Sequence, residues 1–241
     1  MRFNIQKWCF LPDCHSRYAP EKSEEYDPVG ALGVDLGIEN IAVDNDRQIF
    51  ESKKVEKARQ HYNKQRSVLQ KVGTKSAKRK LKKISGKERR FKKDTNHVIS
   101  KAIVSKAKGT TRAIGMEELK YIRSRSRATV RYKGSKRDRY SKWSFGELRN
   151  FVTYKAKKEG VPLKITSSKN TSRQCPECEY IDQRNRKSRN EFECLQCGYR
   201  EMADYVAAKN IAAKARAAVN QPIVAPLFSA VTSPNTLVWG S

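Results

Sequence analysis

The sequence lacks any apolar run close to the roughly 18 residues that a membrane-spanning helix requires. Its first residues, Met1 to Gln6, also lack the apolar core of a secretory signal peptide. We therefore expect a cytoplasmic protein with no membrane partner. Disulfides are rare in that reducing compartment, so the six cysteines are candidates for metal ligands or free thiols.

Acidic residues are scarce in comparison with basic ones. The 241 residues include 52 Lys and Arg but only 25 Asp and Glu, which gives a formal net charge of +27. Such an excess would repel itself unless it met a polyanion, and nucleic acid is a stronger candidate than a membrane surface. In a prokaryotic cell we would expect the protein to be associated with the nucleoid. The length allows one sizeable domain and a small module.

Residues 31–43 form the most informative stretch of the chain. Apolar residues alternate with Gly33 and Asp35, which is the period of a β-strand. Gly37 permits a sharp turn, and residues 41–43 read as a strand that runs back. The carboxylate could cap this turn, or it could be functional, since an unpaired charge in a buried strand is costly.

The rest of the chain predicts a mixed α/β protein. We expect further strands at residues 48–51, 111–116 and 161–166, the second of which ends at Glu117. Helical periodicity indicates a hairpin of two long helices over about residues 52–106, broken at Gly73, and later helices over 143–158 and 201–218. Asp204 falls in the first turn of the last helix, where a carboxylate could simply complement the helix dipole.

Two cysteine pairs with metal-binding spacing lie in residues 171–200. Fifteen residues separate the pair Cys175 and Cys178 from the pair Cys194 and Cys197. Each C-x-x-C turn directs two thiolates at one point, so the two turns predict a zinc ribbon with a tetrahedral Zn²⁺. Four thiolates leave no open position on the metal, which makes this zinc structural. The irregular spacing of Cys9, Cys14 and His15 does not favour a second site.

Basic residues dominate the predicted hairpin and a later loop. The stretch from Glu51 to Lys93 contains eighteen Lys or Arg and three Glu, and residues 120–142 contain ten basic residues and one Asp. This imbalance favours surfaces that contact phosphates without reading bases. Candidate nucleic-acid contacts are Lys53, Lys54, Arg59, Arg66, Lys78, Arg79, Arg89, Arg90, Arg123, Arg125 and Arg127.

Asp35, Glu117 and Asp204 occur at two strand ends and one helix start. A mixed sheet can gather such positions at one edge, where the three carboxylates would repel each other without divalent cations. Mg²⁺ suits oxygen ligands, and Mn²⁺ could replace it. Two such ions can activate water and stabilise the leaving oxygen in phosphodiester cleavage. This is the plan of RNase H-like, or RuvC-like, nucleases.

The motifs resemble those of the TnpB (OrfB) family of insertion-sequence proteins. The first motif is similar to Gly33-x-Asp35-x-Gly37 with Asn40-x-Ala42, and the second to residues 114–119. Thr171-Ser172, the cysteine pairs and Asp204 with residues 207–211 resemble the zinc ribbon and the third motif. The resemblance covers roughly residues 30–215. It implies that Asp35, Glu117 and Asp204 are catalytic Mg²⁺ ligands.

The family resemblance also implies a function and a domain order. Family members, which are related to type V CRISPR effectors and Fanzor, are transposon-encoded, RNA-guided DNA endonucleases. We therefore expect DNA as a partner, and a guide RNA where a larger N-terminal region is supplied, because only about 30 residues precede Asp35. The alternative is a shortened, inactive DNA- or RNA-binding relative. Val206 replaces the usual Asn of the third motif. We expect a remnant at 1–30, a nuclease core at 31–170, the ribbon at 171–200, the last core helix at 201–219 and a tail at 220–241.

Overall fold

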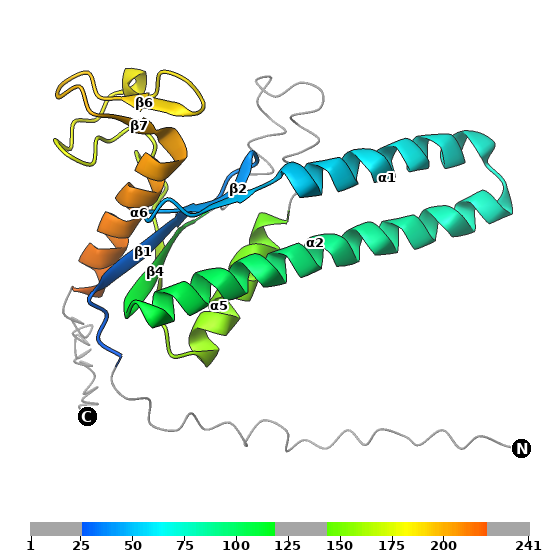
Figure 1. Ribbon diagram of the computed structural model, residues 1–241, viewed down its shortest axis with the longest axis horizontal. Coiled ribbons are helices and arrows are strands. Elements are labelled where there is room, and N and C mark those ends of the chain that lie inside the picture. Colours follow the sequence, from blue (N-terminus) through cyan, green and yellow to red (C-terminus); the bar gives the residue numbers. More distant parts are fainter. Residues whose placement is uncertain (1–25, 119–143, 221–241) are drawn as a thin grey trace, which may run out of the picture.

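The computed structural model describes residues 26–118 and 144–220, which form a mixed α/β structure (Figure 1). The basic loop at 120–142, residues 221–241 of the predicted tail and most of the segment at 1–30 lie outside these residues. The elements in chain order are β1 (Gly30–Asp35), β2 (Asn40–Asp44), β3 (Ile49–Glu51), α1 (Lys53–Val72), α2 (Lys75–Gly109), β4 (Arg112–Glu117), α5 (Phe145–Lys158), β5 (Leu163–Thr166), a 3-10 turn (Gln183–Asn185), β6 (Glu191–Glu193), β7 (Arg200–Met202) and α6 (Ala203–Val219).

The main sheet is mixed and has five strands in the order β3-β2-β1-β4-β5. β1, β4 and β5 are parallel neighbours, whereas β2 and β3 are antiparallel additions at one edge. The register places Val34 beside Met116, and Glu117 beside Thr166. Asp35 and Glu117 therefore stand at the same, C-terminal edge of the sheet, as the sequence predicts.

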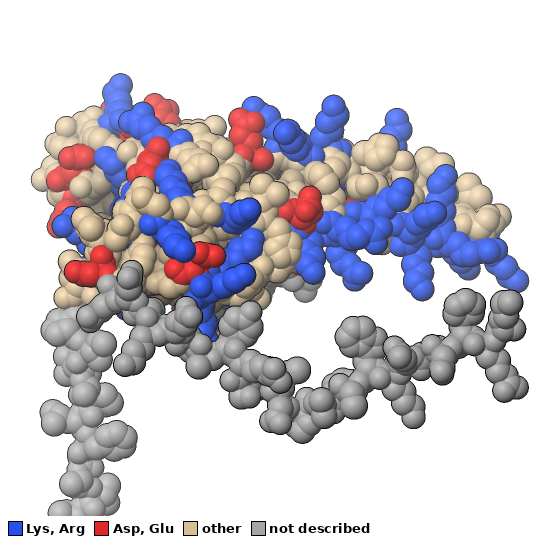
Figure 2. Space-filling view, turned by 60° about the horizontal axis from the view of Figure 1, so that its bottom comes forward, with Lys and Arg blue, Asp and Glu red and all other residues tan. Residues whose placement is uncertain are grey.

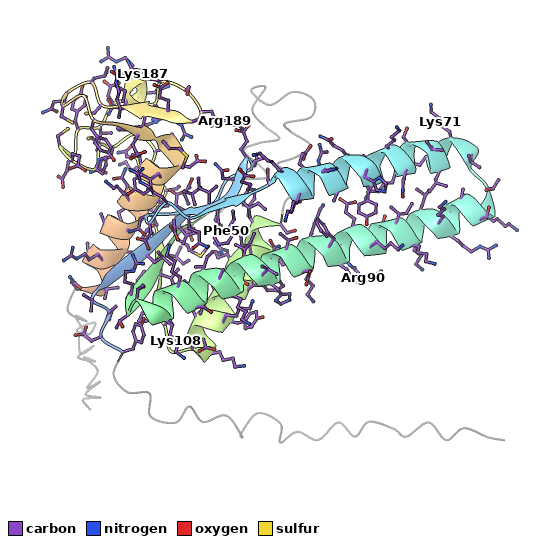
Figure 3. All side chains as sticks on the ribbon, in the orientation of Figure 1. Phe50, Lys71, Arg90, Lys108, Lys187 and Arg189 are labelled. Atoms are coloured by element: carbon purple, nitrogen blue, oxygen red, sulfur yellow. The ribbon has the colours of Figure 1, made fainter. Side chains whose placement is uncertain are left out.

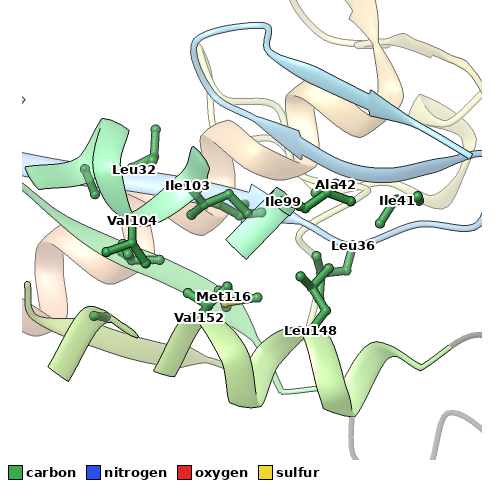
Figure 4. Close-up of a cluster of buried hydrophobic side chains, with 14 of the residues drawn as sticks. Leu32, Leu36, Ile41, Ala42, Ile99, Ile103, Val104, Met116, Leu148 and Val152 are labelled. Carbon is green, nitrogen blue, oxygen red and sulfur yellow. The ribbon is translucent and has the colours of Figure 1, made fainter. Parts of the chain in front are cut away.

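The two faces of the sheet have different side chains because neighbouring residues of a strand point to opposite sides. Leu32 and Val34 of β1 and Met116 of β4 face one large apolar core, which α2 and α5 cover with residues such as Ile103 and Leu148 (Figure 4). Burial of these side chains supplies most of the driving force for this half of the fold.

The opposite face of β1 and β4 carries small residues, and α6 packs directly on it. A Cβ atom added to Gly33 would lie 2.1 Å from the Ala208 carbonyl oxygen, and one added to Gly115 would lie 2.6 Å from the Ala215 Cβ. The alanines of α6 and the two glycines thus allow an unusually close approach of helix and sheet. Asp35 and Glu117 each follow one of these glycines by two residues, so both carboxylates lie on the α6 side of the sheet.

α1 and α2 form a long hairpin that projects from the sheet (Figure 1). Gly73 adopts a left-handed φ of 69° between the helices, as its position in the sequence predicts. The Thr74 side chain accepts a hydrogen bond from the Ala77 N–H and caps the start of α2. The predicted hairpin is confirmed, although α2 continues to Gly109, beyond the expected end.

The last helix starts later than its sequence pattern suggests. Residues 200–202 form β7, which pairs with β6 in the small sheet of the cysteine module, and α6 begins only at Ala203. The N–H and C=O groups of residues 201–202, which helical periodicity predicts in the first turn of the helix, belong instead to the antiparallel pair of β6 and β7. Asp204 still lies in the first turn of α6, as expected.

Candidate functional site

Asp35, Glu117 and Asp204 line one pocket of about 310 Å³. Asp35 and Glu117 come from the ends of adjacent parallel strands, and Asp204 comes from the first turn of the helix that covers their face. The sequence predicts this convergence of the three carboxylates. The close approach of α6 to β1 and β4 is what makes it possible.

The environment of the pocket opposes negative charge on two of the three carboxylates. Burial raises the pKa of Asp35 well above its usual value, and the nearby charges of Glu117 and Asp204 raise it further. Burial also raises the pKa of Glu117, although a hydrogen bond from Thr171 and the charges of Lys214 and Arg186 oppose that shift. Burial is thus the main reason why the pKa values of Asp35 and Glu117 are raised in this pocket.

Neutral donors orient two of these carboxylates. The Asn40 Nδ2 donates to Asp204 Oδ2 at 3.0 Å, and the Thr171 hydroxyl donates to Glu117 Oε1. Asn40 begins β2, directly after the turn that follows Asp35, and Thr171 lies on the connection from β5 to the cysteine module. The resemblance in the sequence singles out both residues without assigning them a role.

Two arginines that the sequence analysis missed complete the wall of the pocket. Arg186 Nη2 lies 3.7 Å from Asp204 Oδ1 and donates to the Arg189 carbonyl at 3.0 Å. The Arg189 side chain forms an ion pair with Glu39, and it extends from the cysteine module toward the start of β2 (Figure 3). Both arginines lie between the cysteine pairs in a basic stretch, where no spacing distinguishes them from their neighbours.

The donor set of the pocket fits hard divalent cations. Carboxylate oxygens are the ligands that Mg²⁺ prefers, and Asp35, Glu117 and Asp204 each bring one carboxylate to the pocket. Among residues 26–118 and 144–220, however, the three carboxylates do not form a group whose ligand atoms all lie within 4.8 Å of one another. The pocket is therefore an open set of ligands and not a closed cage.

The four predicted zinc ligands do form such a group. The sulfur atoms of Cys175, Cys178, Cys194 and Cys197 all lie within 4.8 Å of one another. The Cys175–Cys197 and Cys178–Cys194 sulfur distances are 3.6 Å and 3.5 Å. A tetrahedral Zn²⁺ with bonds of about 2.3 Å separates its sulfur ligands by about 3.8 Å, so the cluster fits zinc.

Local hydrogen bonds build this cysteine module. The Glu179 N–H donates to the Cys175 carbonyl, and the Gly198 N–H donates to the Cys194 carbonyl, which closes each knuckle. Gly198 has a φ of 72°, a left-handed conformation that glycine adopts without a steric penalty. Buried Asn185 ties the knuckles together by donating to the Arg173 and Tyr180 carbonyls and accepting from the Leu195 N–H.

The candidate nucleic-acid contacts fall into three groups. Most of those on α1 and α2 are exposed, namely Lys53, Lys54, Lys78, Arg79, Arg89 and Arg90. Figure 2 shows Lys and Arg crowded along the projecting hairpin, and Arg90 and Lys71 point away from its inner face (Figure 3). Arg123, Arg125 and Arg127 lie outside the described residues, as do Cys9, Cys14 and His15.

Arg59 and Arg66 differ from the other basic residues of the hairpin. Arg59 is buried and forms an ion pair with Glu56 at 2.6 Å. Arg66 forms an ion pair with buried Glu88 of α2 and donates to the Asn63 side chain at 2.7 Å. These two side chains are already engaged within the hairpin, which the sequence could not show because the partners depend on helix packing.

None of the helices in the described ranges combines the length and the apolarity needed to cross a membrane. The cytoplasmic location stays a prediction.

Two protein-family models match this chain, one in its N-terminal half and one in its C-terminal half. Residues 15–126 match the family model OrfB_IS605, described as a probable transposase, and residues 145–211 match the Cas12f1-like TNB domain. The resemblance to the TnpB (OrfB) family is confirmed. A TnpB-like protein of Methanocaldococcus jannaschii is 30% identical over 158 residues, which cover 61% of this chain and 56% of that protein.

CRISPR-associated endodeoxyribonucleases named Cas12f1 are also relatives. The protein of Sulfoacidibacillus thermotolerans is 35% identical over 123 residues, or 51% of this chain and 27% of its own length. That of Syntrophomonas palmitatica is 28% identical over 211 residues, or 80% and 40%. The chain thus spans between about a quarter and just over half of the length of the curated relatives it matches.

Solved Cas12f structures share the fold. A Cas12f1–sgRNA–target DNA complex superposes with a TM-score of 0.58 at 21% identity, over 77% of this chain and 50% of that one. A CRISPR–Cas12f ternary complex gives a TM-score of 0.61 at 22% identity, over 77% and 39%. At this level of identity the similarity establishes a shared fold alone.

Proposed function

We propose that the chain is an RNase H-like (RuvC-type) DNA endonuclease core that depends on divalent metal. The observation that carries this proposal is the convergence of Asp35, Glu117 and Asp204 on one pocket from three separate elements. In this proposal they hold Mg²⁺, or Mn²⁺ in its place. When bound, two such ions supply the activation of water and the stabilisation of the leaving oxygen in phosphodiester cleavage.

Other residues in and beside the pocket orient the carboxylates and bind the phosphates of the substrate. Asn40 holds Asp204 in a fixed orientation through the 3.0 Å hydrogen bond to its carboxylate. Arg186, which also lines the pocket, offers a guanidinium that can bind a phosphate oxygen of the substrate. Arg189 lines the same pocket, where its ion pair with Glu39 would exchange for a contact with an entering phosphate.

The four cysteines supply the second metal site. We propose one structural Zn²⁺ per chain, because the sulfur positions fit a closed tetrahedral site with no place for substrate. Val206, which replaces the usual Asn of the third motif, is fully buried against Phe192 and Cys175 in this module. Its role is therefore packing of α6 against the cysteine module.

The partner in this proposal is nucleic acid, held along the basic hairpin through its phosphates. The exposed lysines and arginines of α1 and α2 support this, as does the presence of sgRNA and target DNA in the complex with similar architecture. A guide RNA follows as a proposal for a chain supplied with the additional region that the longer relatives carry. A role in transposition follows from the match to a transposase family.

The direct test is cleavage of single-stranded DNA by the purified protein with Mg²⁺. We expect nicking by the wild type, loss of nicking in Asp35→Ala, and unchanged nicking in Asp27→Ala, which removes an exposed carboxylate outside the pocket. Binding of the same DNA is measured in parallel. DNA binding without cleavage under any divalent metal would support the inactive, binding-only alternative instead.

A further inference from the structure

Thr171 lies directly beside one of the three carboxylates of the pocket and is 3% exposed. Its hydroxyl can donate to Glu117 Oε1 or to the Ser168 carbonyl oxygen, which is 3.2 Å away. A hydroxyl carries a single proton and can serve only one acceptor at a time. A hydrogen bond to a charged acceptor is the stronger one, so the Thr171 hydroxyl donates to ionised Glu117 and not to the Ser168 carbonyl.

The position of Thr171 is fixed from α6. The side chain of Asn210, which is 5% exposed, donates to the Thr171 carbonyl at 2.7 Å and to the Gln174 carbonyl at 2.8 Å. Both protons of the amide are therefore used on the short segment that connects β5 to the cysteine module. This segment can move relative to α6 only if two buried hydrogen bonds break, which is costly.

The same helix carries Asp204, six residues before Asn210 and about 9 Å away along the helix axis. α6 thus supplies one carboxylate of the pocket directly and reaches a second one through its contact with the Thr171 segment. We propose that Thr171 is a positioning residue for Glu117 and that Asn210 holds Thr171 in place, so that α6 sets the geometry of two of the three metal-binding carboxylates. This inference rests on the proposed function.

A purely structural role for Thr171 makes a different prediction. If the hydroxyl only closes the turn at Ser168, its removal changes stability but leaves metal binding at the carboxylates unaltered. Orientation of a ligand by a donor outside the coordination sphere instead alters metal affinity, typically 10- to 100-fold.

The test compares Thr171→Val, which removes the hydroxyl at nearly constant shape, with Thr171→Ser, which keeps it. Thr153→Val is the matched control, because the Thr153 hydroxyl donates to the Arg149 carbonyl within α5 and Thr153 does not line the pocket. Direct Mn²⁺ binding is followed by the electron paramagnetic resonance of the free ion, and zinc content is measured on the same samples. Asp35→Ala identifies the portion of Mn²⁺ binding that belongs to the pocket.

We expect Thr171→Val to weaken this Asp35-dependent Mn²⁺ binding about 10- to 100-fold with zinc retained. Thr171→Ser should restore most of the affinity, and Thr153→Val should match the wild type. Asn210→Leu, which keeps the volume of the side chain but lacks its donors, should weaken Mn²⁺ binding in the same direction.

Wild-type Mn²⁺ affinity in Thr171→Val with zinc retained would overturn the inference while leaving the proposed nuclease intact. Absence of any Asp35-dependent Mn²⁺ binding in the wild type would instead overturn the proposed function and this inference with it. If Thr171→Val loses its zinc, Thr171→Ala replaces it, and equal Mn²⁺ affinities of the Ala and Ser variants would overturn the positioning role.

Discussion

The cysteine cluster and the carboxylate pocket are both candidate metal-binding sites, but the fold holds their side chains in different ways. The four thiols lie within 4.8 Å of one another on two knuckles of a single small module. The three carboxylates come from β1, β4 and α6 and share a pocket without such a close grouping. Neutral thiols can be gathered without a metal, whereas buried carboxylates repel one another until cations arrive.

The two sets of ligands are also coupled. Arg186 and Arg189, which line the carboxylate pocket, lie on the stretch between the two cysteine pairs. On the same stretch, the Asn190 carbonyl accepts a hydrogen bond from the Ala203 N–H at the start of α6. The cysteine module thus supports one wall of the carboxylate pocket, although no substrate could reach a Zn²⁺ held by its four thiolates.

The largest effect is expected from Cys178→Ser. Structural zinc sites of this kind contribute folding free energy outright, so the variant should lose its zinc and the order of the module. From the sequence alone one expects only destabilisation of the ribbon. The structure predicts in addition that DNA cleavage falls about 100-fold or more, because the wall that holds Arg186 is lost.

Gln196→Ala is the matched control for this variant, since Gln196 lies exposed in the second knuckle between two ligands. It should keep both zinc and cleavage. Unchanged cleavage by zinc-free Cys178→Ser protein would show that the carboxylate pocket does not depend on the cysteine module.

Gly33→Ala should affect the carboxylate pocket and spare the cysteine cluster. The added Cβ would lie 2.1 Å from the Ala208 carbonyl oxygen, so α6 must move away from β1 and take Asp204 with it. We expect a destabilisation of about 1–3 kcal/mol in denaturant unfolding, together with reduced cleavage and normal zinc content. Gly30→Ala in the same strand, where nothing lies within 4 Å of the new Cβ, should stay within about 0.5 kcal/mol of wild type.

Asp35 can also be compared with Asp46, a carboxylate that forms ion pairs with Arg112 and Lys106. Arg112 holds the pKa of Asp46 at about 2 through a 2.5 Å hydrogen bond, and Lys106 contributes at 3.1 Å. A lowered pKa stabilises the folded state above the unfolded value of about 3.9, and this contribution is lost as the pH falls toward 2.

Asp46→Asn should therefore destabilise the zinc-loaded protein at pH 7 by about 1 kcal/mol, because the side chain is 34% exposed and solvent screens the pair. The deficit should shrink as the pH falls from about 4 toward 2. Asp35→Asn, measured at pH 7 with zinc but without added Mg²⁺, should shift stability in the opposite direction. Destabilisation by Asp35→Asn would show that the fold already balances this charge.

The smallest effect concerns the hairpin, which carries neither set of metal ligands. Replacing Arg89 and Arg90 by Ala should weaken DNA binding similarly for unrelated sequences and make the log–log salt dependence shallower, by about 0.7–0.9 for each phosphate that the protein no longer neutralises. Arg59→Ala is the control, because Arg59 is buried against Glu56 and should change stability and not the salt slope. Disappearance of a sequence preference with an unchanged slope would identify Arg89 and Arg90 as base-reading residues.

The sequence predicts the chemistry of both sites better than their connections. The spacing of the cysteines and the alternation around Asp35 follow local rules, since a knuckle or a strand constrains only neighbouring residues. Gly33 and Gly115 are visible in the sequence, but the sequence does not show that α6 is the helix that packs on them. For the same reason the roles of Thr171 and Arg186, and the internal pairing of Arg66, could not be predicted, because each depends on a partner far away in the chain.

The most direct test of two metal sites with separate roles is reconstitution of protein stripped of metal by a chelator under reducing conditions. Zn²⁺ alone, Mg²⁺ alone and both ions are added back, and zinc content, folding and cleavage of single-stranded DNA are measured for each sample. We predict that Zn²⁺ alone restores the fold without cleavage, that Mg²⁺ alone restores neither, and that both together restore cleavage. Full cleavage with Mg²⁺ in zinc-free protein, or with Zn²⁺ and no added Mg²⁺ or Mn²⁺, would contradict this account.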